Sequence, residues 1–211
     1  MIIKTYISGP LDANNYLVVD EISKEAVLID CSEFKQEILD DIKTLGAKVK
    51  YIFLTHGHFD HTIGLNQTKQ AFGVKSYIGK EDKYLIEKTD LMLNMMGLEP
   101  MDKLPEIDCY IDDGQEFNIG NIKIKAYLTP GHSKGGMVYL VNNEFLFSGD
   151  TIFQGTYGRT DLWGGDIDEM ISSYKNILFK FDDNIKVFSG HGSSSTIGYE
   201  KLNNDILDYL G

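Results

Sequence analysis

The residues best suited to chemistry lie within seven consecutive positions, 55–61, where the sequence reads THGHFDH. Neutral imidazole and carboxylate are the ligands that Zn²⁺, Fe²⁺ and Mn²⁺ use in proteins. In an extended chain His56 and His58 point the same way, because side chains alternate along a strand. Asp60 and His61 begin the next helical stretch and point elsewhere. One metal ion would not easily take all four groups, whereas two adjacent ions would.

Three further groups stand at the ends of apolar, strand-like runs. His132 follows the run 122–128, His191 follows the run 185–188, and Asp150 closes the run FLFSGD. Strand ends are where a rigid scaffold presents chemical groups. The chain holds five histidines, and none lies outside this pattern. We therefore predict that these groups converge on one metal centre.

The elements that must position these groups are strands and helices in alternation. Gly46 and Gly73 are predicted to end two helices, and Ser32 is the predicted N-cap of the first. Asn-containing turns at 120–121 and 142–143 predict hairpins. Strands are expected at 2–7, 15–20, 25–30, 49–54 and 185–188 and within 107–148, and helices at 34–45, 62–72, 81–89, 166–179 and 196–210. We expect one domain over residues 1–211, with two mixed sheets packed face to face and helices outside.

Composition and charge exclude several classes of protein. The chain has 211 residues, 42% apolar and 25% charged, which is typical of a soluble globular protein. No apolar run approaches the roughly 18 residues of a membrane span. A net charge of −12 disfavours nucleic acid and anionic membranes as partners. Two cysteines and no recognisable signal peptide lead us to expect a cytoplasmic protein.

A family resemblance rests on these motifs in their order along the chain: THGHFDH, a later GH, SGD and a final GHG. They resemble the metallo-β-lactamase superfamily over the whole chain. The resemblance implies an α+β fold, a four-layer αββα sandwich of two mixed β-sheets with the metals at one edge. It also implies His56, His58 and His132 on a first metal, Asp60, His61 and His191 on a second, and Asp150 bridging both.

Further segments resemble the glyoxalase II-like (hydroxyacylglutathione hydrolase-like) branch of that superfamily. They read NNYLV at 14–18, GDTIF at 149–153, GRTD at 158–161 and STIGYE at 195–200. The branch implies a metal-dependent hydrolase of a small-molecule thioester, such as an S-acyl (hydroxyacyl) thiol conjugate. Two departures are Cys31-Ser32 and Ser193, where the branch usually has Pro-Gly and Pro. With about twenty residues after His191, we expect no counterpart of the helical extension that binds the glutathione carboxylates in that branch, so the thiol carrier stays open.

The expected mechanism uses two divalent metals, with Zn²⁺ favoured and Fe or Mn as alternatives. Two metals about 3.5–4 Å apart bring the pKa of a shared water toward neutrality, and the resulting metal-bound hydroxide attacks the thioester carbonyl. One metal stabilises the oxyanion, and the thiolate leaves without a strong general acid. Asp60 and Asp150 are the expected catalytic carboxylates, since Asp150 bridges the metals and Asp60 orients the water or takes its proton.

Other residues have weaker signals. Asp30 is a candidate hydrogen-bond partner for the imidazole of a metal ligand. The alternative is that it is an ordinary carboxylate in a turn at the end of a strand. Arg159, the only arginine, either pairs with Asp161 or clamps a substrate carboxylate, and we favour the pair. The methionine-rich stretch 91–101 is a substrate wall or ordinary core. Tyr157, Lys134 and Trp163 are candidate substrate contacts.

The main alternative is a persulfide dioxygenase on the same fold. It would use one Fe²⁺ held by His56, His132 and Asp150. A nuclease is disfavoured by the charge, a flavo-diiron reductase by His58, and a secreted β-lactamase by the lack of an export segment. A monomer or a homodimer fits the sequence equally well.

Overall fold

The computed structural model describes residues 1–210, which form two six-stranded sheets. The first sheet contains β1 (Ile2–Ser8), β2 (Ala13–Val19), β3 (Glu25–Ile29), β4 (Lys48–Phe53), β5 (Ser76–Gly79) and β6 (Cys109–Ile111), in that order. The second contains, in order, β14 (Ser195–Thr196), β13 (Lys186–Ser189), β10 (Phe145–Gly149), β9 (Met137–Val141), β8 (Ile122–Leu128) and β7 (Glu116–Ile119). A small hairpin, β11 (Ile152–Phe153) with β12 (Thr156–Tyr157), stands apart from both.

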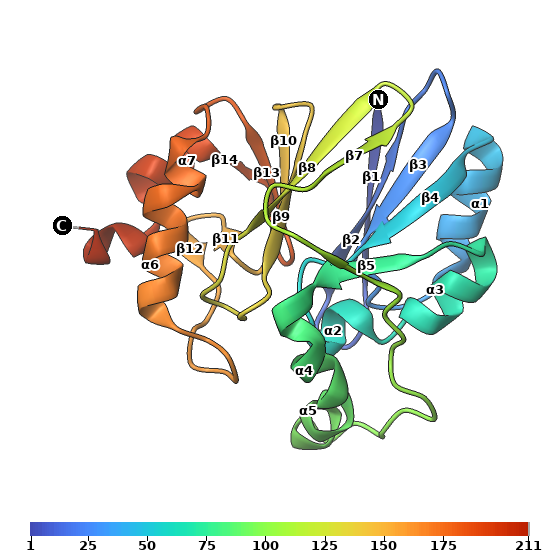
Figure 1. Ribbon diagram of the computed structural model, residues 1–211, viewed down its shortest axis with the longest axis horizontal. Helices are drawn as coiled ribbons and strands as arrows, with labels where there is room; N and C mark the ends of the chain where they lie inside the picture. Colours follow the sequence, from blue (N-terminus) through green and yellow to red (C-terminus); the bar gives the residue numbers. More distant parts are fainter. Residues whose placement is uncertain (211) are drawn as a thin grey trace.

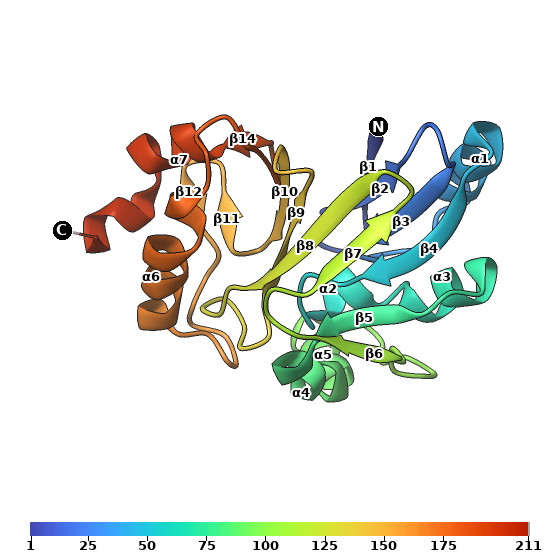
Figure 2. The same ribbon diagram turned by 45° about the horizontal axis from the view of Figure 1, so that its top comes forward.

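Helices cover the outer face of each sheet (Figure 1; Figure 2). The first sheet is covered by α1 (Gln36–Leu45) and α3 (Leu65–Phe72), and the second by α6 (Ile167–Asn176) and α7 (Ile197–Asn203). Three short helices lie at one edge of the sandwich: α2 (Phe59–Thr62), α4 (Lys83–Glu87) and α5 (Thr89–Met95). Single 3₁₀ turns complete the chain at Lys80–Asp82, Leu178–Lys180 and Asp205–Tyr209. The predicted four-layer αββα sandwich of mixed sheets is therefore confirmed.

Both sheets mix parallel and antiparallel pairing. In the first, β1, β2 and β3 form an antiparallel meander, and β3 to β6 run parallel. In the second, β7 to β10 are antiparallel, whereas β10 pairs with β13 in parallel. In the β9–β10 hairpin Val141 pairs with Phe145, and the turn between them has positive φ at Asn142 and Asn143, a conformation that asparagine adopts more readily than most residues. Both predicted hairpins are present.

An aromatic core holds the sheets together. Tyr16, Phe53, Phe117, Tyr139 and Phe147 lie between them and are buried. The rings of Phe53 and Tyr139, which belong to opposite sheets, stack with centroids 5.1 Å apart. Because this interior is closely packed, the ends of β4, β8, β10 and β13 have fixed relative positions.

Helix ends follow the predicted signals, and helix beginnings less so. Gly46 and Gly73 adopt left-handed conformations at the C-caps of α1 and α3. Ser32 is not the N-cap of α1; its backbone N–H donates to Asn15 within the core. The predicted helix 62–72 begins later, as α3 at Leu65, and Thr62 belongs instead to α2. At Gly64, between the two helices, a Cβ would meet Glu33 backbone atoms at 2.8 Å. No helix among residues 1–210 is long and apolar enough to cross a membrane.

Candidate metal centre

Four strand ends bring the predicted groups to one edge of the sandwich. His56 follows β4 of the first sheet, while His132, Asp150 and His191 follow β8, β10 and β13 of the second. His58 precedes α2, which carries Asp60 and His61. This edge lies beside α2 in Figure 1. The centre is thus built from both sheets.

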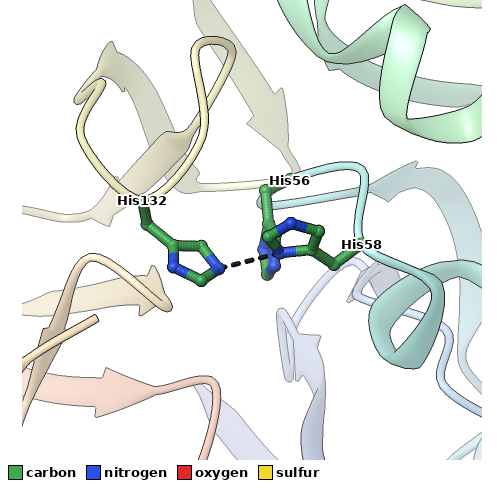
Figure 3. A group of neighbouring side chains, drawn as sticks. All are labelled: His56, His58 and His132. Atoms are coloured by element: carbon green, nitrogen blue, oxygen red, sulfur yellow. Dashed lines mark hydrogen bonds between the residues drawn. The ribbon is translucent and has the colours of Figure 1, made fainter. Parts of the chain in front are cut away.

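A first group consists of His56, His58 and His132, whose rings converge in Figure 3. Nδ1 of His58 lies 2.8 Å from Nε2 of His132, and all three rings are buried. Nε2 of His56 is buried and has no hydrogen-bond partner among the described residues. One nitrogen from each ring lies within 4.8 Å of the others, which is a spacing that one ion can span.

A second group consists of Asp60, His61 and His191. Nε2 of His61 lies 3.3 Å from Nε2 of His191, and Oδ2 of Asp60 lies 3.2 Å from the latter nitrogen. His61 is fully buried, whereas the side chain of His191 is 27% exposed. Solvent therefore reaches this group from the His191 side.

The carboxylate of Asp150 lies between the two groups. Its Oδ1 is 3.4 Å from Nε2 of His61, and its Oδ2 is 3.6 Å from Nε2 of His132. Oδ1 is buried without a hydrogen-bond donor among residues 1–210. Gly190 makes room for it, because a Cβ there would lie 2.1 Å from that oxygen.

Three of the other ring nitrogens, in His56, His61 and His132, lie beside oxygen atoms. Nδ1 of His61 lies 2.9 Å from Oδ2 of Asp30, and Nδ1 of His132 lies 2.8 Å from the backbone oxygen of Arg159. Nδ1 of His56 lies 3.0 Å from Oγ1 of Thr55, which donates to Asp30. Such contacts fix the tautomer and leave the opposite nitrogen for a ligand.

Electrostatics divide the histidines into neutral and charged rings. Burial, with the charge on His61, lowers the pKa of His56 well below its ordinary value. Burial, with the neighbouring His132, lowers the pKa of His58 to about 3. Burial opposes a charge on His61 too, but Asp60, Asp150 and Asp30 outweigh it and raise its pKa. The three carboxylates therefore favour the protonated form of His61 in the metal-free cluster.

These residues fit divalent metal ions. Two buried atoms, Nε2 of His56 and Oδ1 of Asp150, lack hydrogen-bond partners, although such atoms are normally satisfied. Imidazole and carboxylate are the ligands of Zn²⁺, Fe²⁺ and Mn²⁺. The cluster of histidine and aspartate is a site for divalent metals, and the assignment of individual ligands stays a prediction.

Asp82 was not singled out in the sequence, although it connects two loops of the centre. Its buried carboxylate accepts hydrogen bonds from the N–H groups of Gly57 and Gly135 and from the Ser133 hydroxyl. Burial raises its pKa, and these hydrogen bonds oppose the rise. No local pattern marks Asp82, since all three partners are remote in sequence.

A cavity of about 670 Å³ opens at the metal centre. Some of the remaining predicted residues line this cavity and others do not. Arg159 and Asp161 line it and form the expected bidentate pair, with N–O distances of 2.7 and 2.8 Å. Tyr157 packs against Tyr209, and neither it nor Lys134 is among the described lining residues. Trp163 and the methionines of α5 do line the cavity.

Comparison with known proteins gives the family. Residues 8–191 match the model of the "Metallo-beta-lactamase superfamily". The chain is 34% identical to hydroxyacylglutathione hydrolase GloC of Haemophilus influenzae, with 92% of each chain covered. Among solved structures it resembles the BLEG-1 B3 metallo-β-lactamase (29% identity, TM-score 0.88, 98% and 99% covered) and a di-iron-bound form of TTHA1623 (30%, 0.83, 96% and 98%). The chain therefore belongs to the metallo-β-lactamase superfamily and is one of its metal-dependent hydrolases.

Proposed function

We propose that this protein is a binuclear metal-dependent hydrolase of small thioesters, such as S-acyl or hydroxyacyl thiol conjugates. One ion would be held by His56, His58 and His132, the other by Asp60, His61 and His191, and both would share Asp150. The observation that carries the proposal is the position of Asp150, whose carboxylate contacts both histidine groups. Its Oδ1 lies 3.4 Å from Nε2 of His61, and its Oδ2 lies 3.6 Å from Nε2 of His132 and 3.7 Å from Nε2 of His191.

Two related proteins support the proposal. The homologue from Haemophilus influenzae is a hydroxyacylglutathione hydrolase, which favours a thioester substrate here. The di-iron-bound form of TTHA1623 supports a pair of ions and makes iron an alternative. We favour zinc because a site rich in neutral histidines suits it.

The chain's own residues would bind and orient the reactants. When bound, divalent metals lower the pKa of a water and polarise a carbonyl. Asp60 is buried beside His191 at the open side of the cavity, where its free carboxylate oxygen can orient a water or accept its proton. The low pKa of a thiol leaving group makes a strong general acid unnecessary, so the mechanism needs no further protonated side chain.

The proposal includes the surroundings in which the protein acts. Its partner is a small molecule, and it acts as a monomer or homodimer without nucleic acid or membrane. A cytoplasmic location is supported by Cys31 and Cys109, which are both free thiols as a reducing compartment keeps them.

The test is metal content followed by a thioester panel, on protein purified without added metal or chelator. We expect about two divalent ions per chain and hydrolysis that a chelator abolishes and Zn²⁺, Fe²⁺ or Mn²⁺ restores. About one iron per chain, with oxygen consumption on a persulfide and no thioester hydrolysis, would instead establish the dioxygenase alternative held by His56, His132 and Asp150.

A further inference from the structure

We propose that the substrate carries an apolar chain beside its scissile carbonyl, and that the cavity binds this chain against a methionine wall formed by Met92, Met95 and Met96. The inference rests on the proposed thioester hydrolysis and names the class of thioester. The three methionines lie on or directly after α5 and line the same cavity as the metal centre. A reacting carbonyl at the centre would therefore place its substituents beside them.

Exposed apolar side chains gather around this cavity. Met95 is 70% exposed and Met96 52%, and Leu162 and Trp163, which line the same cavity, are each more than a third exposed. Leu11 completes the group. A chain with a net charge of −12 has many charged residues for its surface, so apolar side chains concentrated at one opening indicate a ligand.

The charged side chains that line the cavity outside the metal centre are paired with each other. Apart from the metal-centre residues, the described lining carries only two charged side chains, Arg159 and Asp161, which bind each other bidentately. Lys88 lies outside the lining, with Nζ 4.5 Å from the centroid of the Trp163 ring. Outside the metal centre, Arg159 is the one cation among the described lining residues and Asp161 already pairs with it, so an anionic thiol such as glutathione, with two carboxylates, would find no unpaired cation in this lining. A neutral, apolar substituent fits the lining better.

Two parts of the cavity lining, the Trp163 loop and the methionine wall, differ in rigidity. Tyr84 on α4 donates a hydrogen bond to the backbone oxygen of Trp163 over 2.8 Å, which ties the Trp163 loop to the helical edge. The methionine wall has flexible, unbranched side chains that adapt to different shapes. A restrained Trp163 loop beside adaptable methionine side chains predicts tolerance for chains of several lengths.

Binding can be measured without turnover, because Trp163 is the only tryptophan in the chain. Its fluorescence would be titrated, in the metal-loaded protein, with methyl, butyl and hexyl thioethers of N-acetylcysteamine, which cannot be hydrolysed. We expect the dissociation constant to fall about threefold for each added methylene. An affinity that ignores chain length, or tighter binding of S-hexylglutathione than of the neutral hexyl ligand, overturns the inference.

A pair of variants tests the methionine wall itself. Met95→Gln/Met96→Gln keeps the side-chain length and helix propensity but makes the wall polar, and it should flatten the dependence on chain length. Leu202→Gln is the matched control, since Leu202 is 79% exposed on α7, far from the cavity. A double variant that retains the wild-type dependence contradicts the assignment.

Hydrolysis assays separate this inference from the proposed function. Thioesters with a hexyl chain on the acyl side and on the thiol side would be compared with the acetyl thioester of N-acetylcysteamine. A higher kcat/KM for one of the two identifies which substituent the wall binds. Hydrolysis of all three at equal rates leaves the thioesterase standing and overturns the apolar preference. Binding that strengthens with the length of the ligand's alkyl chain, without hydrolysis of any of the three thioesters, supports the apolar preference and contradicts the thioesterase.

Discussion

Asp82 accepts a hydrogen bond over 2.9 Å from the backbone N–H of Gly57, the residue between the first two histidines of the centre. The same carboxylate accepts from the Ser133 hydroxyl at 2.7 Å and from the Gly135 N–H at 2.6 Å. Ser133 directly follows His132. One buried carboxylate therefore sets the distance between the two loops that carry the first histidine group.

Asp82→Asn should weaken metal binding without removing any ligand. The amide keeps the shape of the side chain, but its NH₂ cannot accept from donors that the carboxylate now satisfies. We expect the affinity for the first ion to fall about 10–100-fold, as is typical for groups that orient ligands. The measurement is competition with a chromogenic chelator.

Asp108→Asn is the matched control for that variant. Asp108 likewise accepts hydrogen bonds from a backbone N–H and a hydroxyl, both of Ser76, but it lies at the β5–β6 edge away from the centre. It should change stability without changing metal affinity. Equal metal affinities in the two variants would show that Asp82 has only a structural role.

Asp30→Asn should weaken the binding of the second ion. Oδ2 of Asp30 contacts Nδ1 of His61 at 2.9 Å and accepts from the Thr55 hydroxyl at 2.8 Å. Asn tolerates the positive φ of this position, so the backbone should persist. We expect an affinity loss of about 10–100-fold at that site, seen by calorimetric titration of metal-free protein. Asp12→Asn, at another aspartate with positive φ, should leave metal binding unchanged.

Asp150→Ala removes the group placed between the two histidine clusters. We expect metal content to fall and kcat/KM to drop by more than about 100-fold, beyond the loss typical of groups behind the ligands. Elemental analysis and the thioester assay measure the two effects. Full activity with full metal content would be incompatible with a shared bridging carboxylate.

Arg159→Lys tests whether the arginine shapes the loop or clamps substrate. The guanidinium and Asp161 are both largely exposed, so the pair should stabilise the fold by less than about 1 kcal/mol. We expect KM for a neutral thioester to stay within about twofold of wild type. A selective rise in KM for thioesters that bear a carboxylate would assign the arginine to substrate binding.

Asp20 should give the protein an acid-sensitive contact between its sheets. The hydrogen bonds from the Asn121 N–H and the Ser23 hydroxyl lower the pKa of Asp20 to about 2. A lowered pKa contributes stability above the ordinary value near 3.8 that is lost as the pH falls toward 2. In chelator-treated protein, wild type should lose more stability than Asp20→Asn across this window. If the denaturation midpoints of wild type and Asp20→Asn fall by the same amount across this pH range, the prediction is wrong.

The features predicted correctly are those that neighbouring residues determine. Gly46 and Gly73 end helices because a left-handed C-cap favours glycine, and Asn142-Asn143 forms the expected hairpin turn. The positions of the histidines after strands were also readable, since apolar runs stop where the polar chemistry begins. Convergence of the seven side chains followed from that pattern, whereas their roles as ligands still need the metal measurements.

Features that depend on remote contacts were missed. Ser32 has the chemistry of an N-cap, but its N–H is taken by Asn15 of a neighbouring strand. The chain at Glu33 packs so closely against Gly64, between α2 and α3, that no side chain would fit there. Asp82 acquires its role only when residues 25 and about 50 positions away arrive beside it. Such encounters have no periodic signature in the sequence.

The division of the centre between the two sheets has a mechanical consequence. His56 belongs to one half of the sandwich, and His132, Asp150 and His191 to the other, so neither half alone retains a complete set of donors. An ion bound here would cross-link the two halves of the sandwich. Metal occupancy and resistance to unfolding must then rise together. Loss of metal would consequently make the two sheets easier to separate at the edge that carries the metal centre.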